Sequence, residues 1–80
     1  MRTIEFKMER EGLVKVGDEV QVDESELSTL QGVMYYYTII PALAMSNNIP
    51  SRQRLKQLQG KVSDVKVTES ASFVYVDFNE

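Results

Sequence analysis

The sequence contains no cysteine and no histidine. Without cysteine, neither a disulfide nor a thiolate zinc site can stabilise the chain, which fits a reducing cytoplasm. Without histidine, the chain lacks the commonest general base and the commonest metal ligand. A nucleophilic serine would also lack its usual base. We therefore expect a protein that is not an enzyme and that binds no metal or cofactor.

A second scarcity is local, because no Asp, Glu, Lys or Arg occurs between Leu27 and Ser51, although 26% of the chain is charged. This run contains three consecutive tyrosines, residues 35–37, followed by Thr38-Ile39-Ile40-Pro41. Such a run is either buried core, a partner surface, or both. Its length suits a membrane span, but its tyrosines lie in the middle, whereas tyrosine favours the membrane interface. We expect no membrane span.

Length and charge balance set further bounds. The 80 residues are predicted to form a single domain, 1–80, and 42% hydrophobic residues are enough to build a core. Nine basic and twelve acidic residues give a net charge of −3. This balance argues against broad non-specific binding to nucleic acid or anionic membranes. The composition favours a small acidic domain in the cytoplasm.

Alternation of apolar and polar residues predicts strands toward both ends of the chain. Residues 4–8 alternate regularly, and residues 13–22 hold either one bent strand or two short ones. Residues 61–68 alternate with one slip, which a β-bulge near 63–64 would explain. Residues 73–78 alternate again. We expect the last two strands to form a hairpin.

The middle of the chain allows two interpretations. Leu27, Leu30, Met34 and Tyr37 recur at helical spacing, which predicts helices over 26–38 and, beginning at Pro41, over 41–46. A short basic helix is predicted over 51–59. The alternative is a strand over 33–40, which is rich in β-forming residues. Periodicity does not separate the two, and the helical spacing together with an Ala-Leu-Ala-Met stretch favours helix.

Three segments resemble those of SH3-like β-barrels, including the KOW-type modules of translation-associated proteins. They are Val16-Gly17-Asp18-Glu19-Val20-Gln21-Val22, Leu58-Gln59-Gly60-Lys61-Val62-Ser63-Asp64-Val65 and Phe73-Val74-Tyr75-Val76-Asp77-Phe78. The resemblance implies a binding module rather than an enzyme. It covers a minority of the chain, and residues 23–59 stand where the family has a short loop. Basic residues that would contact nucleic acid are also not evident on the strands.

The predicted fold is therefore α+β: a small SH3-like antiparallel β-barrel or curled sheet, with a helical insertion over about residues 26–59 packed on one open end. Apolar residues of the insertion are expected to pack against valines of the strands. The predicted core comprises Leu27, Leu30, Met34, Leu43, Leu55, Leu58, Val16, Val20, Val62, Val65, Val74 and Val76.

Two groups of residues form the predicted partner surface. Neighbouring tyrosines on a helix cannot all point inward, and tyrosine is enriched at interfaces, so Tyr35 and Tyr36 are candidates. The basic residues are Arg52, Arg54, Lys56 and Lys61. They would contact phosphate or an acidic partner, or else form a solvated face that pairs with the acidic strands.

We expect a non-enzymatic module that mediates protein–protein interaction, with another protein or a second copy of itself as partner. Two alternatives remain open at this stage. One is a nucleic-acid or ribonucleoprotein accessory module, which is not favoured by the charge. The other is a small acidic regulator of a nucleic-acid enzyme.

Overall fold

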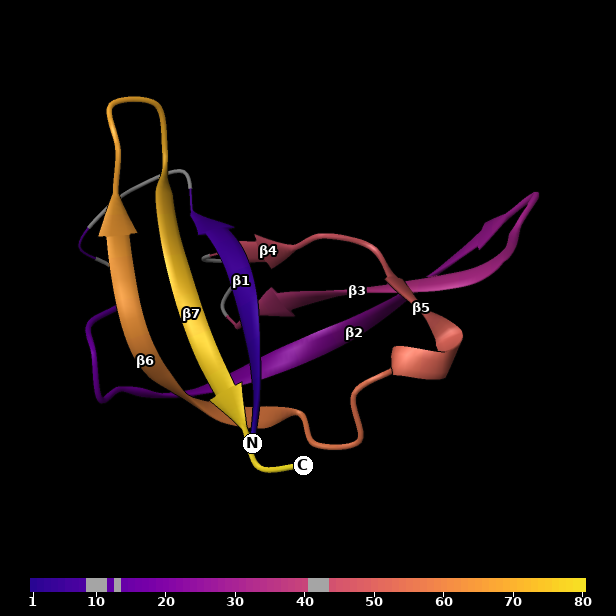
Figure 1. The fold of residues 1–80 in the computed structure, drawn as a ribbon, viewed down its shortest axis with the longest axis horizontal. Helices are drawn as coiled ribbons and strands as arrows, with labels where there is room; N and C mark the ends of the chain where they lie inside the picture. The colour runs from indigo at the N-terminus through magenta and orange to yellow at the C-terminus, as the bar shows by residue number, and fades with distance from the viewer. Residues whose placement is uncertain (9–11, 13, 41–43) are drawn as a thin grey trace.

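Strands dominate the computed structural model, which describes residues 1–8, 12, 14–40 and 44–80 (Figure 1). The strands are β1 (Arg2–Met8), β2 (Glu19–Thr29), β3 (Gly32–Ile39), β4 (Ala44–Ser46), β5 (Ile49–Pro50), β6 (Gln59–Val67) and β7 (Ser72–Phe78). The one helical element among the described residues is a single 3₁₀ turn, η1 (Ser51–Gln53).

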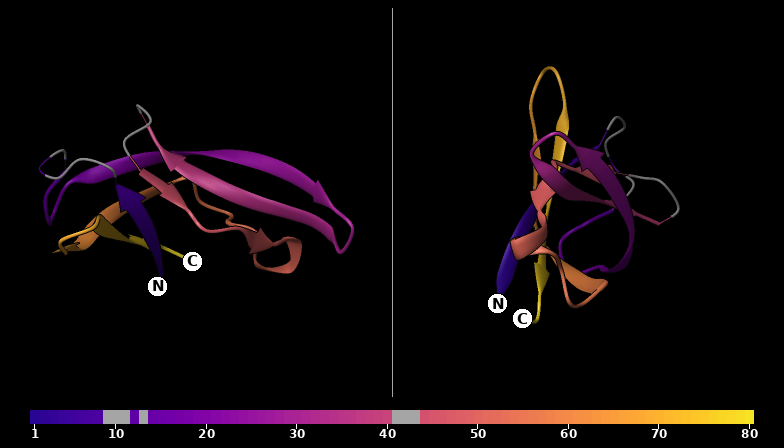
Figure 2. Two further views of the ribbon diagram at one scale, coloured as in Figure 1. Left: turned by 90° about the horizontal axis from the view of Figure 1, so that it is seen from above. Right: turned by 90° about the vertical axis from the view of Figure 1, so that its right-hand side faces the viewer.

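The strands form a closed antiparallel barrel. Their order is β2-β6-β7-β1-β4-β3, and a further β2–β3 pairing closes the circle. The short β5 is an extra strand that pairs with the distal part of β3. Figure 2 shows β2 and β3 as one long layer lying over β1, β6 and β7. This architecture of six barrel strands and one extra strand is compatible with a small SH3-like barrel.

The core lies inside the barrel and follows from the strand alternation. Every second residue of β1 and β7 is buried, and the rings of Phe6 and Phe78 pack with their centroids 6.4 Å apart. Full burial of each such side chain stabilises the fold by about 1.5–3 kcal/mol. The largest fully buried side chains are Tyr37, Phe6, Phe78, Met8, Ile39, Val22, Val62, Val74 and Val76.

Several predictions made from alternation are confirmed. The strand predicted over 4–8 is β1, and the last two strands, β6 and β7, form an antiparallel hairpin. The predicted bulge is present, since the register shifts between Val62 and Asp64. Within 13–22, strand structure begins only at Glu19, and residue 13 lies outside the described residues.

The predicted α+β class and its helical insertion over 26–59 are wrong. Residues 26–38 contain the end of β2, a two-residue turn and most of β3, and 51–59 is helical only in η1. Of the predicted helix over 41–46, residues 44–46 are β4, and 41–43 lie outside the described residues. The physical reason is that the β-branched and aromatic residues from 33 to 39 pack better on a pleated sheet than on a helix. The strand alternative was the right one.

The correction to the fold also changes the core. Leu27, Leu30, Leu58 and Val16 are exposed rather than buried, because they lie on turns, on irregular segments or on the outward side of a strand. The other members are distributed as follows: Leu55, Val20, Val62, Val74 and Val76 are buried, Val65 packs against the core, Met34 is half-buried, and Leu43 lies outside the described residues.

Within the parts of the chain that the structure describes, no helix reaches the length and apolar character that a membrane crossing requires.

Candidate binding surface on the β2–β3 arm

The β2–β3 hairpin continues beyond the barrel as an arm, defined here as residues 23–38 (Figure 1). Strand β2 pairs with β6 from Glu19 as far as Gln21, whereas its pairing with β3 continues to the Thr29–Gly32 pair. The turn between the strands exposes Leu30 completely. Gly32 has φ 120°, a backbone conformation that favours glycine, and the Thr29 hydroxyl donates to its carbonyl at 2.7 Å.

The inner face of the arm, which continues the barrel interior, is held by a polar network. The Tyr37 hydroxyl donates to Glu24 Oε2 at 2.8 Å and accepts a hydrogen bond from the Leu55 backbone N–H, also at 2.8 Å. Arg54 donates to the same carboxylate, from Nε to Oε2 at 2.9 Å and to Oε1 at 3.1 Å, and from Nη2 to Oε1 at 2.6 Å. Its guanidinium carbon lies 4.6 Å from the centroid of the Tyr35 ring. The network joins β2, β3 and the segment after η1.

The electrostatics of this network fix its protonation states at neutral pH. The hydrogen bonds from Arg54 hold the pKa of Glu24 below its ordinary value, and the same contact raises the pKa of Arg54. Burial, with a contribution from Glu24, raises the pKa of Tyr37 to about 12. Glu24 is therefore a carboxylate, and Tyr37 is a neutral hydrogen-bond donor. Since each charge has its partner, the network positions the arm rather than supplying a reactive group.

The outer face of the arm is apolar. Directly paired residues share a face of a sheet, so Leu27 and Met34 lie together on the side opposite Glu24 and Tyr37. Tyr36, two residues along β3 from Met34, lies on the same side. The pairings of β4 and β5, and the hydrogen bond from the Ile40 N–H to the Gln21 carbonyl, add Met45, Pro50 and Ile40. We call these residues together the outer face: Leu27, Met34, Tyr36, Ile40, Met45 and Pro50.

Exposure and charge distinguish this face from the rest of the surface. Leu27, Ile40 and Met45 are 41%, 48% and 51% exposed, and Tyr36 is half-buried. Within residues 23–38, the register places a single charge, Asp23, on this side of the sheet. An apolar area of exposed and half-buried side chains on one side of a sheet is typical of a surface that meets another macromolecule.

The predicted tyrosine surface divides between the two sides of the sheet. Tyr35 is 9% exposed and lies on the inner face beneath Arg54, where it packs in the core. Tyr37 is fully buried, and Tyr36 lies on the outer face. Because the segment is a strand, alternate tyrosines point to opposite sides.

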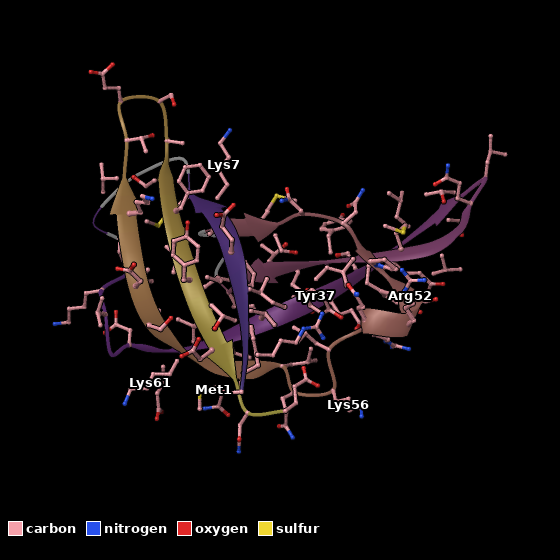
Figure 3. All side chains as sticks on the ribbon, viewed as in Figure 1. Met1, Lys7, Tyr37, Arg52, Lys56 and Lys61 are labelled. Carbon is pink, nitrogen blue, oxygen red and sulfur yellow. The ribbon has the colours of Figure 1, made fainter. Side chains whose placement is uncertain are left out.

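The predicted basic residues are dispersed rather than gathered into one patch. Arg54 is engaged by Glu24, and Lys61 stands directly between Glu19 of β2 and Asp77 of β7 in the sheet. Figure 3 shows Arg52 and Lys61 at opposite ends of the view, with Lys56 below η1. The helix predicted over 51–59 would have placed Arg52 and Lys56 one turn apart on one face, but η1 ends at Gln53.

An open pocket of about 650 Å³ lies at the end of the barrel where β2 meets β6, in a size range that small ligands occupy. Val16 on its wall is 59% exposed, so water enters freely. Its charged lining residues, Glu19, Lys61 and Asp77, are the neighbours already described in the sheet. Among the described residues, no three acidic side chains gather closely enough to hold a metal ion.

Sequence reasoning missed Glu24 as the shared partner of Arg54 and Tyr37, and it missed Met45 and Ile40 as exposed residues. Both omissions come from the helical interpretation, because without a strand pairing nothing brought Glu24 opposite Tyr37 or assigned Ile40 and Met45 to a side of a sheet. The available signal was the β-forming composition of 33–40.

Comparisons of the chain with protein-family models, with curated proteins and with solved structures found no significant match in any of the three.

Proposed function

We propose that this protein is a non-enzymatic protein-interaction module that acts in the cytoplasm and self-associates through its arm. The observation that carries the proposal is the outer face, where β2, β3, β4 and β5 bring apolar residues together, with Leu27, Ile40 and Met45 exposed, on a side of the arm that carries a single charge. Its composition, with methionine, tyrosine and leucine and almost no charge, is that of the buried centre of a protein interface.

The inner network supports the same function because it makes the arm rigid. Arg54 and Tyr37 hold Glu24 against the core from two sides, and Leu55 ties the network to the chain beneath it. A surface that is already ordered loses less conformational entropy on binding than a mobile one. The arm therefore offers its apolar side chains in a fixed arrangement.

A resemblance to SH3-like and KOW-type barrels favours binding over catalysis, and the charges favour protein over nucleic acid as the partner. A nucleic-acid partner would need a surplus of free cations, whereas the net charge is −3, Arg54 is paired with Glu24, and Lys61 lies between two carboxylates, which leaves Arg52 and Lys56 of the predicted basic residues. The outer face itself consists of uncharged residues, and Lys7 of β1 lies directly opposite Met45 at its border.

The test compares substitutions inside and outside the arm. Leu27→Ser combined with Tyr36→Ser removes apolar area from the outer face and leaves the inner network intact. Val67→Ser is the matched control, because Val67 is 55% exposed and lies at the end of β6. Tyr35 is unsuitable for substitution because its ring packs in the core.

Sedimentation equilibrium over a range of protein concentrations is the measurement. We expect the native chain and Val67→Ser to associate equally, and the double variant to associate at least about tenfold more weakly, a difference of about 1.4 kcal/mol. Circular dichroism checks that each variant is folded. A native chain that stays monomeric at every concentration, or a control that weakens association as much as the double variant, refutes the proposal.

A further inference from the structure

One edge of the arm carries main-chain groups without a partner strand. The Val22 N–H donates to the Leu58 carbonyl on the β6 side, while the Gln21 carbonyl accepts from Ile40 on the β3 side. The main-chain N–H and C=O groups of successive residues in an antiparallel strand point to alternate neighbouring strands. In β2 the main-chain groups of even-numbered residues therefore point away from β3. Beyond Val22, no strand among the described residues pairs with that side. The main-chain N–H and C=O groups of Glu24, Glu26 and Ser28 therefore lie along the open edge of β2, without a partner strand.

This edge lacks most of the features that protect exposed strands. Proline, charged side chains and bulges usually prevent a further strand from adding. Residues 23–29 contain no proline, and their pairing with β3 has no register shift, so the carboxylates of Asp23, Glu24 and Glu26 are the protective features that this edge has. Of the three, Glu24 gives the edge little protection, because Arg54 and Tyr37 hold its carboxylate on the inner face. An extended strand can thus add here by main-chain hydrogen bonding.

We propose, building on the self-association proposed above, that the occupant is the same edge of a second copy, paired antiparallel and centred on Leu27. In this register Leu27 opposes Leu27 of the second copy, Glu26 opposes Ser28, and Ser25 opposes Thr29. The Glu26–Ser28 pairs exchange main-chain hydrogen bonds, and the Ser28 hydroxyl lies beside a carboxylate. The two-fold axis passes through the Leu27 pair, so the interface is isologous and closes as a dimer.

The charges of β2 select this register. Centring the pair on Ser25 places Glu24 opposite Glu26, and centring it on Glu24 or Glu26 places that residue opposite itself. Like charges directly opposed across strands are destabilising. Centring the pair on a residue beyond Leu27 leaves fewer paired residues, because β2 ends at Thr29. The Leu27 register alone combines a five-residue overlap, 25–29, with no directly opposed carboxylates.

The same register accounts for the outer face. It joins two arms into one sheet of order β3-β2-β2-β3 with both outer faces on the same side. Leu27 and Met34 of each copy then form a continuous apolar row, flanked at each end by Pro50. Since each chain carries a net charge of −3, added salt is expected to strengthen the dimer by screening the repulsion.

Single-cysteine variants of the full chain test the register, because the native chain has no cysteine that would complicate a cross-link. Residues opposed in a non-hydrogen-bonded pair have Cα atoms about 4.5 Å apart, within the range of a disulfide. We therefore expect Leu27→Cys to form a covalent dimer under mild oxidation. Ser25→Cys mixed with Thr29→Cys should cross-link as a heterodimer. Either variant alone should not, because identical residues are then about 13–14 Å apart.

The outcomes separate this inference from the proposed function. If the native chain associates and Leu27→Ser/Tyr36→Ser weakens it, but these cross-links fail, the edge register is overturned and the function stands. Cross-linking of Met45→Cys in that case assigns the contact to packing between outer faces. If the native chain is monomeric at all concentrations, both proposals fall. Protection of the β2 amides from exchange by an added lysine-valine peptide would then assign the edge to a basic strand.

Discussion

Tyr37→Phe removes one oxygen atom and thereby two hydrogen bonds of the inner network. The hydroxyl donates to Glu24 Oε2 and accepts from the Leu55 N–H, each at 2.8 Å. Phenylalanine fills the same volume in the core apart from that oxygen, so packing changes little. The variant consequently reports on the polar connection between the arm and the chain beneath it.

The expected loss of stability follows from these two bonds. Leu55 is 5% exposed, and a buried N–H left without an acceptor costs about 1–3 kcal/mol. Loss of the donor to the Glu24 carboxylate adds to this, which gives about 2–4 kcal/mol in total. An 80-residue domain has only about 4–12 kcal/mol of stability at the usual value per residue. Tyr37→Phe should thus remove a large fraction of it.

Urea denaturation at neutral pH measures the effect, with Tyr36→Phe as the matched control. Tyr36 lies on the opposite side of the same strand, so its variant should stay within about 0.5 kcal/mol of the native chain. A Tyr37→Phe variant as stable as Tyr36→Phe would refute the reasoning.

Alkaline pH provides a second, independent measurement on the same residue. The pKa of Tyr37 rises from an ordinary value of 10.0 to about 12, so the unfolded chain releases this proton first. The contribution of the protonated Tyr37 hydroxyl to the free energy of unfolding is complete below pH 10 and is lost as the pH rises toward 12, by about 2–3 kcal/mol. We expect this part of the alkaline loss to be missing from Tyr37→Phe.

Three further predictions concern other parts of the molecule. Because Arg54 lowers the pKa of Glu24, the stability lost in Glu24→Gln, measured by urea denaturation, should be greatest at neutral pH and should shrink as the pH falls below 4.5. Gly60→Ala should lower the free energy of unfolding by about 1–3 kcal/mol, because the Cβ of the new alanine would lie 2.7 Å from a main-chain oxygen of β7. Gln59→Ala should change the free energy of unfolding little, and equal effects of the two substitutions would contradict the close approach. RNA and DNA should show no binding by fluorescence anisotropy at about 50 mM salt, because the chain carries a net charge of −3 and the basic residues in its described part form no continuous patch. Salt-sensitive binding under these conditions would restore the nucleic-acid alternative.

The two ends of the chain could be predicted from the sequence because their alternation is unambiguous. Residues 73–78 alternate without interruption, and the slip in 61–68 was correctly attributed to a bulge. The middle could not be assigned in this way. Leu27, Leu30 and Met34 match a helical spacing by coincidence, because the turn at residues 30–31 interrupts a period of two. The β-forming composition of 33–40 favours a strand there, and pairing with β4 and β5, which no local pattern reveals, adds to that preference.

The candidate surface could be predicted only in outline. The charge-free run does contain exposed apolar residues, and one of the three tyrosines lies on the outer face. The pairing of Glu24 with Arg54, thirty residues apart, depends on the closure of the barrel and leaves no trace in local sequence. The side of the sheet on which each residue lies requires the strand register, and a one-residue shift would invert it.

The hydrogen bond from the Leu55 N–H to the Tyr37 hydroxyl gives the molecule a natural reporter. This amide proton is protected by a side chain rather than by a neighbouring strand, so it exchanges with solvent whenever the base of the arm lifts. Amides paired between β1 and β7 are expected to exchange when the barrel itself opens. The ratio of the two exchange rates would therefore measure, at a single residue, how often the arm detaches while the rest of the fold stays intact.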